Sequence, residues 1–361
     1  MTRWRRGRTV PGAFPAPSRA LPTNAPPRTR VPHAMTPPTT TAPSPAAAPS
    51  LTGPSTPTSS HPGRRRRTAL QRWRTLLPGI LMGGPAVAVF LAMFVIPMIL
   101  AAVLSFTDWN GYSLNFSFVG WENYLKAFRS PRSTQAAVFT GVIAVVGTIL
   151  CNAVGLAIAA LISGPGRSNT ILRTIFFYPY VISALIIGFL WSAMLSPTGA
   201  VNGLLGTLGL PALPFLTDPT FAKASVIFTI VWSHFGFNMI LFLAGIKSVP
   251  AEYYEAATVD GASRWQQFRS ITLPLIAPVF TVNLVLTLVG LLKAYDVVLS
   301  LTDGGPAGST QTIVYQILKD SFANSALGFG AAQSMILLIV TAVVGLAVTL
   351  VRRRAEQKAT D

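Results

Sequence analysis

One polar loop carries charged and small residues at a spacing that suits docking against another protein surface. Glu255 is followed by Ala256 and Ala257, and Asp260 and Gly261 come shortly after. The two alanines let another backbone approach closely, while the Glu255 carboxylate can pair with a basic group. Glycine permits a sharp break in the chain at this point. The chemistry predicted for this loop is therefore non-covalent recognition.

The surrounding residues predict a helix, a break and a second helix. Residues 251–258 have good helical propensity apart from two tyrosines. Ser263 and Gln266 have the spacing of a capping box for the second helix. Leu273 and Pro274 then lead into the next apolar run. An alternative is a helical loop that lies at a membrane surface and has no protein partner.

The rest of the chain has the composition of a membrane protein. It has 361 residues, of which 51% are hydrophobic and 11% are charged, whereas soluble domains carry about 25% charged residues. A helix needs about 20 residues to cross a bilayer core, and continuous apolar runs favour helices over strands. Six runs are long enough: 75–107, 133–166, 174–195, 224–246, 270–292 and 321–351. We expect an all-α bundle of six transmembrane helices, with the polar loop between the fourth and fifth.

The composition divides the chain into three parts. Residues 1–70 hold 15 of the 29 prolines, mixed with Ser, Thr and Arg, and we expect this tail to be disordered because it has little apolar surface to bury. Residues 71–354 form the six-span domain. Residues 355–361 are expected to be a short C-terminal tail.

The net charge of +17 is explained by topology. Lys and Arg gather in the tail and at the ends of the apolar runs, which suits contact with lipid headgroups and argues against nucleic-acid binding. If the N-terminus is cytoplasmic, the inner segments hold 22 Lys and Arg and the outer loops hold five. The positive-inside rule therefore predicts cytoplasmic N- and C-termini and a cytoplasmic Glu255 loop. Cys151 is the single cysteine, and His234 has no neighbours at ligand spacing, so we expect no disulfide and no metal site.

The polar loop resembles a known family signature. Glu-Ala-Ala, then Gly261, Ile271 and Leu273-Pro274, is similar to the signature of the inner-membrane permease subunits of ATP-binding-cassette (ABC) importers. Residues 118–124, 236–239, 254–263 and 302–306 are similar to the carbohydrate-importing branch. The resemblance covers about residues 75–354. It implies that the loop is a coupling helix, with Glu255, Ala256, Ala257, Asp260 and Gly261 docking on an ATPase subunit.

The resemblance also implies partners for the chain. These are a second and different permease subunit, two cytoplasmic ATPase subunits and an extracytoplasmic sugar-binding protein, assembled in the cell membrane. No Gly-x-x-x-x-Gly-Lys-Ser/Thr sequence occurs, so we expect no enzyme activity and no cofactor on this chain, with ATP and Mg on the ATPase subunits. Two alternatives are a secondary transporter driven by an ion gradient and a membrane scaffold that transports nothing.

Four polar residues within the apolar runs are candidates for the solute path, because polar groups are costly there. Asn238 can hydrogen-bond a sugar hydroxyl or a neighbouring helix. Lys293 and Asp296 are three residues apart and could meet on one helix face, with Tyr295 stacking on a sugar ring. The alternative is that these side chains extend to the membrane interface.

A second loop is a candidate contact for the binding protein. By resemblance, Asp303, Gly304, Gly305 and Pro306 face the extracytoplasmic partner, and the glycines allow close backbone approach. The alternative is an ordinary flexible connection between the fifth and sixth spans.

Overall fold

The computed structural model describes residues 83–113 and 115–360, and for residues 353–360 it gives the course of the helix alone. These residues form α-helices with short π-helical turns, and they contain no β-strand, only a single bridge between Thr107 and Phe118. The predicted all-α class is confirmed. The predicted disordered tail, residues 1–70, lies outside the described residues.

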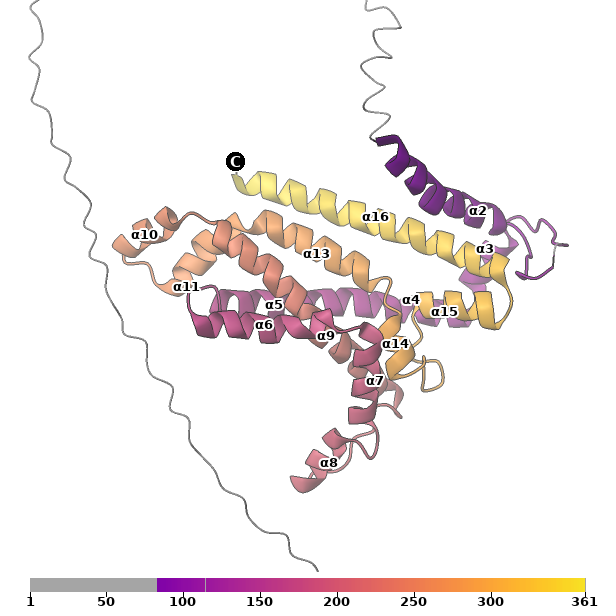
Figure 1. The fold of residues 1–361 in the computed structure, drawn as a ribbon, viewed down its shortest axis with the longest axis horizontal. Coiled ribbons are helices and arrows are strands. Elements are labelled where there is room, and N and C mark those ends of the chain that lie inside the picture. The colour runs from indigo at the N-terminus through magenta and orange to yellow at the C-terminus, as the bar shows by residue number, and fades with distance from the viewer. Residues whose placement is uncertain (1–82, 114, 361) are drawn as a thin grey trace, which may run out of the picture. The chain divides into compact units, whose positions relative to one another are not determined.

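The helices differ widely in length (Figure 1). In chain order they are η1 (Leu91–Val95), α2 (Ile96–Leu104), α3 (Glu122–Arg129), α4 (Pro131–Val142), η2 (Ile143–Gly147), α5 (Thr148–Leu161), α6 (Arg167–Val181), α7 (Ala184–Leu195), α8 (Ala200–Thr207), α9 (Pro219–Ser248), α10 (Ala251–Val259), α11 (Arg264–Gln267), η3 (Phe268–Thr272), α12 (Leu273–Leu275), α13 (Ala277–Leu291), α14 (Asp296–Leu301), α15 (Ile313–Leu318), η4 (Lys319–Ala323) and α16 (Leu327–Thr360).

Five stretches among the described residues are long and apolar enough to cross a membrane. They are Gly83–Leu104, Pro131–Leu161, Ala184–Thr207, Pro219–Ser248 and Leu327–Arg352. A bent pair, Arg264–Leu275 and Ala277–Leu291, makes a sixth if it is counted as one span. The structure therefore has the multi-helix membrane architecture that the apolar runs predict.

Two of the predicted spans are not single helices. The run 174–195 breaks between Val181 and Ala184, because Ile182 and Ser183 have extended backbones. α6 and α7 consequently run in different directions (Figure 1). The run 270–292 bends by 68° at Ile276, and Pro278 lies in the first turn of α13, just after the bend.

Small residues bring the central helices close together. A Cβ atom added at Gly155 of α5 would lie 2.8 Å from the Cβ of Asn238 and 2.9 Å from the backbone nitrogen of Met239, both in α9. Gly236 similarly faces the carbonyl of Phe176, which lets α6 pack against α9. Close approach at small residues is a common way to pack helices in a membrane.

A buried carboxylate ties three other segments together. Asp320, in η4, accepts hydrogen bonds from Gln316 (3.0 Å), Asn324 (2.9 Å) and Gln333 (3.1 Å). The amide of Gln333, in α16, also donates to the hydroxyl of Ser133 in α4, at 3.2 Å. Amide donors compensate the cost of burying this carboxylate.

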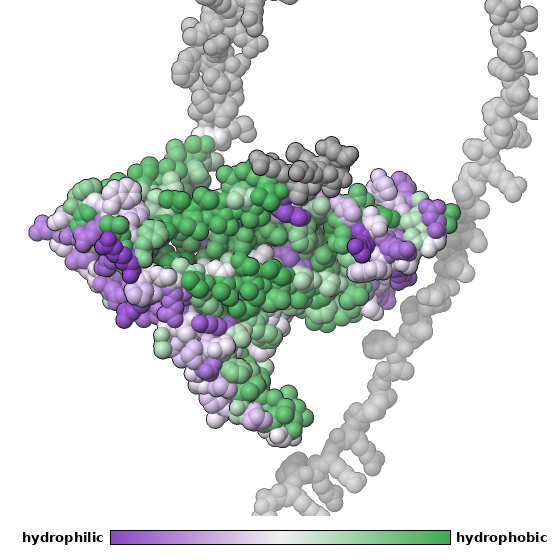
Figure 2. Space-filling view, turned by 180° about the vertical axis from the view of Figure 1, so that it is seen from behind, coloured by the Kyte–Doolittle hydropathy of each residue, from purple (hydrophilic) through white to green (hydrophobic). Residues whose placement is uncertain are grey.

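Polar groups gather at the two ends of the helix bundle. α10, α11 and the end of α16 lie at one end, and α3, α15 and the start of α16 lie at the other (Figure 1). Figure 2 shows a broad apolar surface between these ends. Large apolar side chains such as Met93 and Phe94 are 69% and 66% exposed on it. This distribution is typical of a chain surrounded by lipid or by other membrane subunits.

Candidate functional site

Three of the predicted docking residues, Glu255, Ala256 and Ala257, lie on α10, which projects from the bundle, and Asp260 and Gly261 follow its end (Figure 1). None of its residues is buried. Glu255, Ala256 and Asp260 are exposed, and Ala257 is partly exposed. Val259 presents an apolar side chain that is 88% exposed. A small exposed surface of this kind, with acidic and apolar groups together, is suited to contact with another protein.

The break after α10 has a specific backbone structure. The N–H of Ala262 donates to the carbonyl of Ala257 (2.9 Å), and that of Gly261 donates to the carbonyl of Thr258 (3.1 Å). This pair of bonds is a Schellman motif, which requires a left-handed residue at the position of Gly261. Gly261 has φ +77°, as that motif demands. The glycine therefore ends the helix, as its position in the sequence predicts.

The second helix begins with the predicted capping box. The backbone nitrogen of Ser263 donates to the side chain of Gln266 (2.8 Å), and the backbone nitrogen of Gln266 donates to the Ser263 hydroxyl (3.4 Å). Gln267 then donates to the hydroxyl of Thr258 at 3.1 Å, which joins α11 to α10. α10 and α11 are thus held as one elbow.

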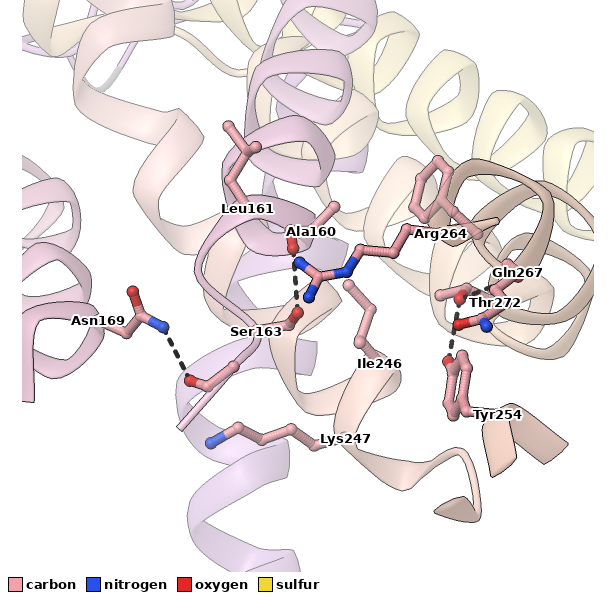
Figure 3. Close-up of a pocket in the computed structure, with 12 residues that line it drawn as sticks. Ala160, Leu161, Ser163, Asn169, Ile246, Lys247, Tyr254, Arg264, Gln267 and Thr272 are labelled. Atoms are coloured by element: carbon pink, nitrogen blue, oxygen red, sulfur yellow. Dashed lines mark hydrogen bonds between the residues drawn. The ribbon is translucent and has the colours of Figure 1, made fainter. Parts of the chain in front are cut away.

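A further hydrogen bond joins this elbow to the start of the bent span (Figure 3). The hydroxyl groups of Tyr254 in α10 and Thr272 in η3 lie 2.9 Å apart. The same residues line a polar cavity of about 600 Å³ between the elbow, the end of α9 and the turn after α5. α10 is therefore tied to η3 by a side-chain hydrogen bond as well as by the intervening backbone.

Three of the four candidate solute-path residues come together in a second cavity. Lys293, Tyr295 and Asp296 line a space of about 130 Å³. The helix does not continue through them, because α13 ends at Leu291 and α14 begins at Asp296. The expectation that Lys293 and Asp296 share one helix face is therefore wrong. Irregular backbone within a membrane protein is tolerated where it borders a cavity.

His234 lines the same cavity and was not predicted as a site residue. Its Nδ1 lies 2.9 Å from the carbonyl of Ile230 and 2.9 Å from the hydroxyl of Ser233. These contacts fix the ring, which also packs edge-to-face against Tyr180. The sequence contains no signal that His234 lies beside Lys293, Tyr295 and Asp296, which are about 60 residues further along the chain.

Asn238 lies apart from this cavity and joins two helices. Its side chain is 1% exposed. The amide nitrogen donates to the Thr287 hydroxyl (3.1 Å), and the same hydroxyl lies 3.3 Å from the amide oxygen. The backbone carbonyl of Asn238 also accepts from Asn283 at 3.3 Å. Within this chain, Asn238 bonds to a neighbouring helix, which is one of the two roles that we considered for it from the sequence.

The loop at residues 303–306 is held by hydrogen bonds. The hydroxyl of Tyr315 donates to the carbonyl and to the carboxylate of Asp303, at 3.0 and 2.8 Å. The Thr310 hydroxyl donates to the carbonyl of Gly305 at 2.7 Å. Burial, followed by the hydrogen bond to Asp303, raises the pKa of Tyr315 to about 12. The loop is therefore an ordered structure, in contrast to the flexible connection considered from its glycine content.

Comparison with known proteins places this architecture in a family. Residues 151–359, which include α10 and both cavities, match the family described as binding-protein-dependent transport system inner membrane component. The chain belongs to this family. It is 35% identical over 305 residues to the diacetylchitobiose uptake system permease protein NgcF of Streptomyces coelicolor, covering 81% of this chain and 86% of that protein.

Other relatives of the permease lead to the same conclusion. It is 31% identical to the lactose transport system permease protein LacF of Rhizobium radiobacter, covering 77% of this chain and 94% of that protein. A solved bacterial alginate ABC transporter, in complex with a periplasmic protein that holds an alginate pentasaccharide, has a chain with a TM-score of 0.70 and 26% identity, covering 79% of this chain and 98% of that chain.

These relationships establish the class of the molecule. The permease is a multi-pass membrane subunit of an ABC importer. They support that function over an ion-driven transporter and over a scaffold without transport. The family is that of a transport subunit that depends on a binding protein.

Proposed function

We propose that this permease forms part of a carbohydrate path and transmits the motion of a separate ATPase subunit to it. The observation that carries this proposal is the α10 elbow: α10 has no buried residue, and Tyr254 and Thr272 hydrogen-bond it to the bent span. A partner that moves α10 would move η3 and α13 with it. ATP and Mg are then bound on two ATPase subunits, and this chain performs no reaction of its own.

The carbohydrate assignment rests on the relatives and on the second cavity. Diacetylchitobiose, lactose and alginate are named for three of the similar transporters. In this chain, Lys293, Tyr295 and Asp296 offer a cation, an aromatic ring and a carboxylate at one cavity. These groups can hydrogen-bond and stack on a sugar. A cavity of about 130 Å³ is small for an oligosaccharide, which supports completion of the path by a second, different permease subunit.

The orientation proposed for the chain follows from charge. The turn after α5 and the end of α9 line one cavity with α11, and Arg352 of α16 bonds to Thr281 at the same end. These are the segments expected to be cytoplasmic from their Lys and Arg content. The loop at Asp303 then faces outward, toward the binding protein.

Cysteine labelling tests this orientation. A cysteine probe is placed at Val259, whose side chain is exposed, and not at Ser263, whose side chain forms the capping box. The native Cys151 is buried. We expect Val259→Cys to react only with reagent inside the cell and Phe118→Cys, whose native side chain is 78% exposed at the other end, only from outside. The reverse pattern would overturn the orientation.

Reconstitution tests the function itself. The permease is placed in vesicles with its partner permease, the ATPase subunits and the binding protein, and uptake of labelled oligosaccharide is measured. We expect accumulation that requires both ATP and the binding protein. Uptake driven by an ion gradient without ATP would contradict the proposal.

A further inference from the structure

The polar cavity beside α10 contains two cations without partners. Lys247, at the end of α9, and Arg264, at the start of α11, both line it (Figure 3). Neither side chain makes a hydrogen bond or an ion pair with another residue that the structure describes. None of the lining residues is acidic. The cavity therefore concentrates positive charge that the chain itself does not neutralise.

The other polar groups of the cavity wall already have partners. The Ser163 hydroxyl donates to the carbonyl of Ala160 (3.0 Å), and the Asn169 amide donates to the carbonyl of Gly164 (3.0 Å). Tyr254 is bonded to Thr272, as described above. The donors that remain available to a ligand are the two cations, so a ligand for this cavity should be an anion.

The position of Arg264 is not explained by helix stability. It occupies the first position of α11, where the helix dipole disfavours a positive charge. Arg173 adds a third positive charge behind the wall, where its guanidinium donates to the carbonyls of Ile162 (2.6 Å) and Gly164 (3.0 Å). An anion bound in the cavity would reduce the repulsion among these positive charges.

We propose that this cavity binds a phosphate group, carried by an anionic lipid headgroup or by a soluble phosphate ester. Guanidinium and ammonium groups together are a common pair of phosphate ligands, and about 600 Å³ is ample for a phosphate ester. Leu161 at the rim is 81% exposed, and Trp265 nearby in α11 is 68% exposed. These apolar groups favour the lipid as the source, because its chains would lie against them.

Phosphate binding would add a link between three segments that line or adjoin the cavity. Lys247 belongs to the end of α9, Arg264 belongs to the elbow, and Arg173 holds the turn after α5. A bound phosphate would fix the angle between α10–α11 and the bundle. This inference concerns ligand binding by the chain and does not depend on the carbohydrate or the ATPase assignment.

The lipid source is tested on the purified full chain in nanodiscs with equal parts of phosphatidylcholine and phosphatidylglycerol. Native mass spectrometry after detergent extraction measures the lipid that stays bound. We expect preferential retention of phosphatidylglycerol, reduced about tenfold in Lys247→Gln/Arg264→Gln because the charge-assisted bonds to the phosphate are lost, a change of about 1.4 kcal/mol. The matched control is Arg269→Gln, because Arg269 is an exposed cation in η3 that does not line the cavity.

The soluble source is tested on the same chain in detergent. An amine-reactive reagent labels Lys247, and inorganic phosphate is compared with chloride at equal ionic strength. Protection of Lys247 by phosphate, without protection of Lys223, would support a soluble phosphate ester. The charge-conserving variant Lys247→Arg/Arg264→Lys should keep phosphatidylglycerol bound in the nanodisc experiment, which separates loss of charge from loss of folding.

Three results would overturn the proposal. One is the absence of binding in both arms, and another is an equal loss of binding in Arg269→Gln and in the double variant. The third is a cross-link from Lys247 to a carboxylate of the ATPase subunit in the assembled transporter, with no phosphate bound. That result would assign the cavity to the protein interface.

Discussion

The hydroxyl groups of Tyr254 and Thr272 lie 2.9 Å apart and connect α10 to η3 across the break at Gly261. The two residues are 18 positions apart in the chain. Their hydrogen bond adds to the bond between Gln267 and Thr258, and together the two restrict rotation of α10 about the break at Gly261. The bond between Tyr254 and Thr272 is the contact through which we expect movement of the elbow to reach the bent span.

Tyr254→Phe should therefore weaken coupling more than stability. Loss of one hydrogen bond costs about 0.5–1.5 kcal/mol, so the transporter should still assemble. We expect less oligosaccharide taken up per ATP hydrolysed in vesicles. Tyr253→Phe is the matched control, because Tyr253 is 54% exposed and makes no hydrogen bond to another described residue. An equal effect of the two substitutions would contradict this role for Tyr254.

Glu255→Arg should weaken recovery of the ATPase subunit with the permease. The Glu255 carboxylate is exposed on a helix that contributes nothing to the core, so reversing its charge should leave membrane insertion unchanged. The measurement is the amount of ATPase that co-purifies with the tagged permease. Glu252→Arg reverses an exposed charge on the same helix and should have the smaller effect. Unchanged ATPase recovery with Glu255→Arg would argue against docking at this residue.

Gly261→Ala tests the conformation of the elbow. No atom lies within 4 Å of the position of an added Cβ, so the cost comes from the positive φ alone, about 1 kcal/mol. We expect faster hydrogen exchange at the amides of Gly261 and Ala262, which form the Schellman bonds. Gly261→Asn should be milder, since asparagine tolerates this conformation better. Equal exchange in all three proteins would show that the motif does not hold the break.

Thr287→Val distinguishes a structural role from a solute role at Asn238. The substitution removes the hydroxyl that bonds the Asn238 amide and should reduce thermal stability by about 0.6–2 kcal/mol. If Asn238 serves to join helices, KM for uptake should not change. Ser334→Ala is the control, because that hydroxyl bonds a carbonyl of its own helix at 2.9 Å. A large rise in KM without loss of stability would favour a solute contact.

Alkaline pH should loosen the loop at Asp303. The pKa of Tyr315 is about 12 in the folded chain and about 10 for a free tyrosine, so the folded state holds the proton more tightly. Its contribution to stability is complete below pH 10 and is lost as the pH rises toward 12. The fall in melting temperature over this range should be smaller in Tyr315→Phe. An identical fall in both proteins would contradict the assignment.

Local sequence signals predicted the elbow well. Ser263 and Gln266 form the capping box, and Gly261 takes the left-handed conformation, because both features depend on residues within a few positions of each other. The continuous apolar runs likewise predicted membrane helices. Such signals are available in a single sequence because backbone sterics and hydrophobicity act locally.

Contacts between distant segments could not be predicted in this way. The break at Ile182 and Ser183 lies in an apolar run with no charge and is set by how α7 packs against α14, where Gly188 faces Ser300. The Asp320 network depends on Gln333, whose amide also reaches Ser133, 200 positions away in the chain. His234 and Lys293 line one cavity, and this too depends on how distant segments pack.

Because α10 has no buried residue, selection for folding and selection for partner contact act on different positions of this helix. Substitutions on its outward face remove no core packing, so we expect them to be free to follow changes in the proposed ATPase partner. Two side chains of α10 are bonded to other helices, Tyr254 to Thr272 and Thr258 to Gln267. A nine-residue graft that keeps this tyrosine should thus transfer motor preference between related permeases and leave solute choice untouched.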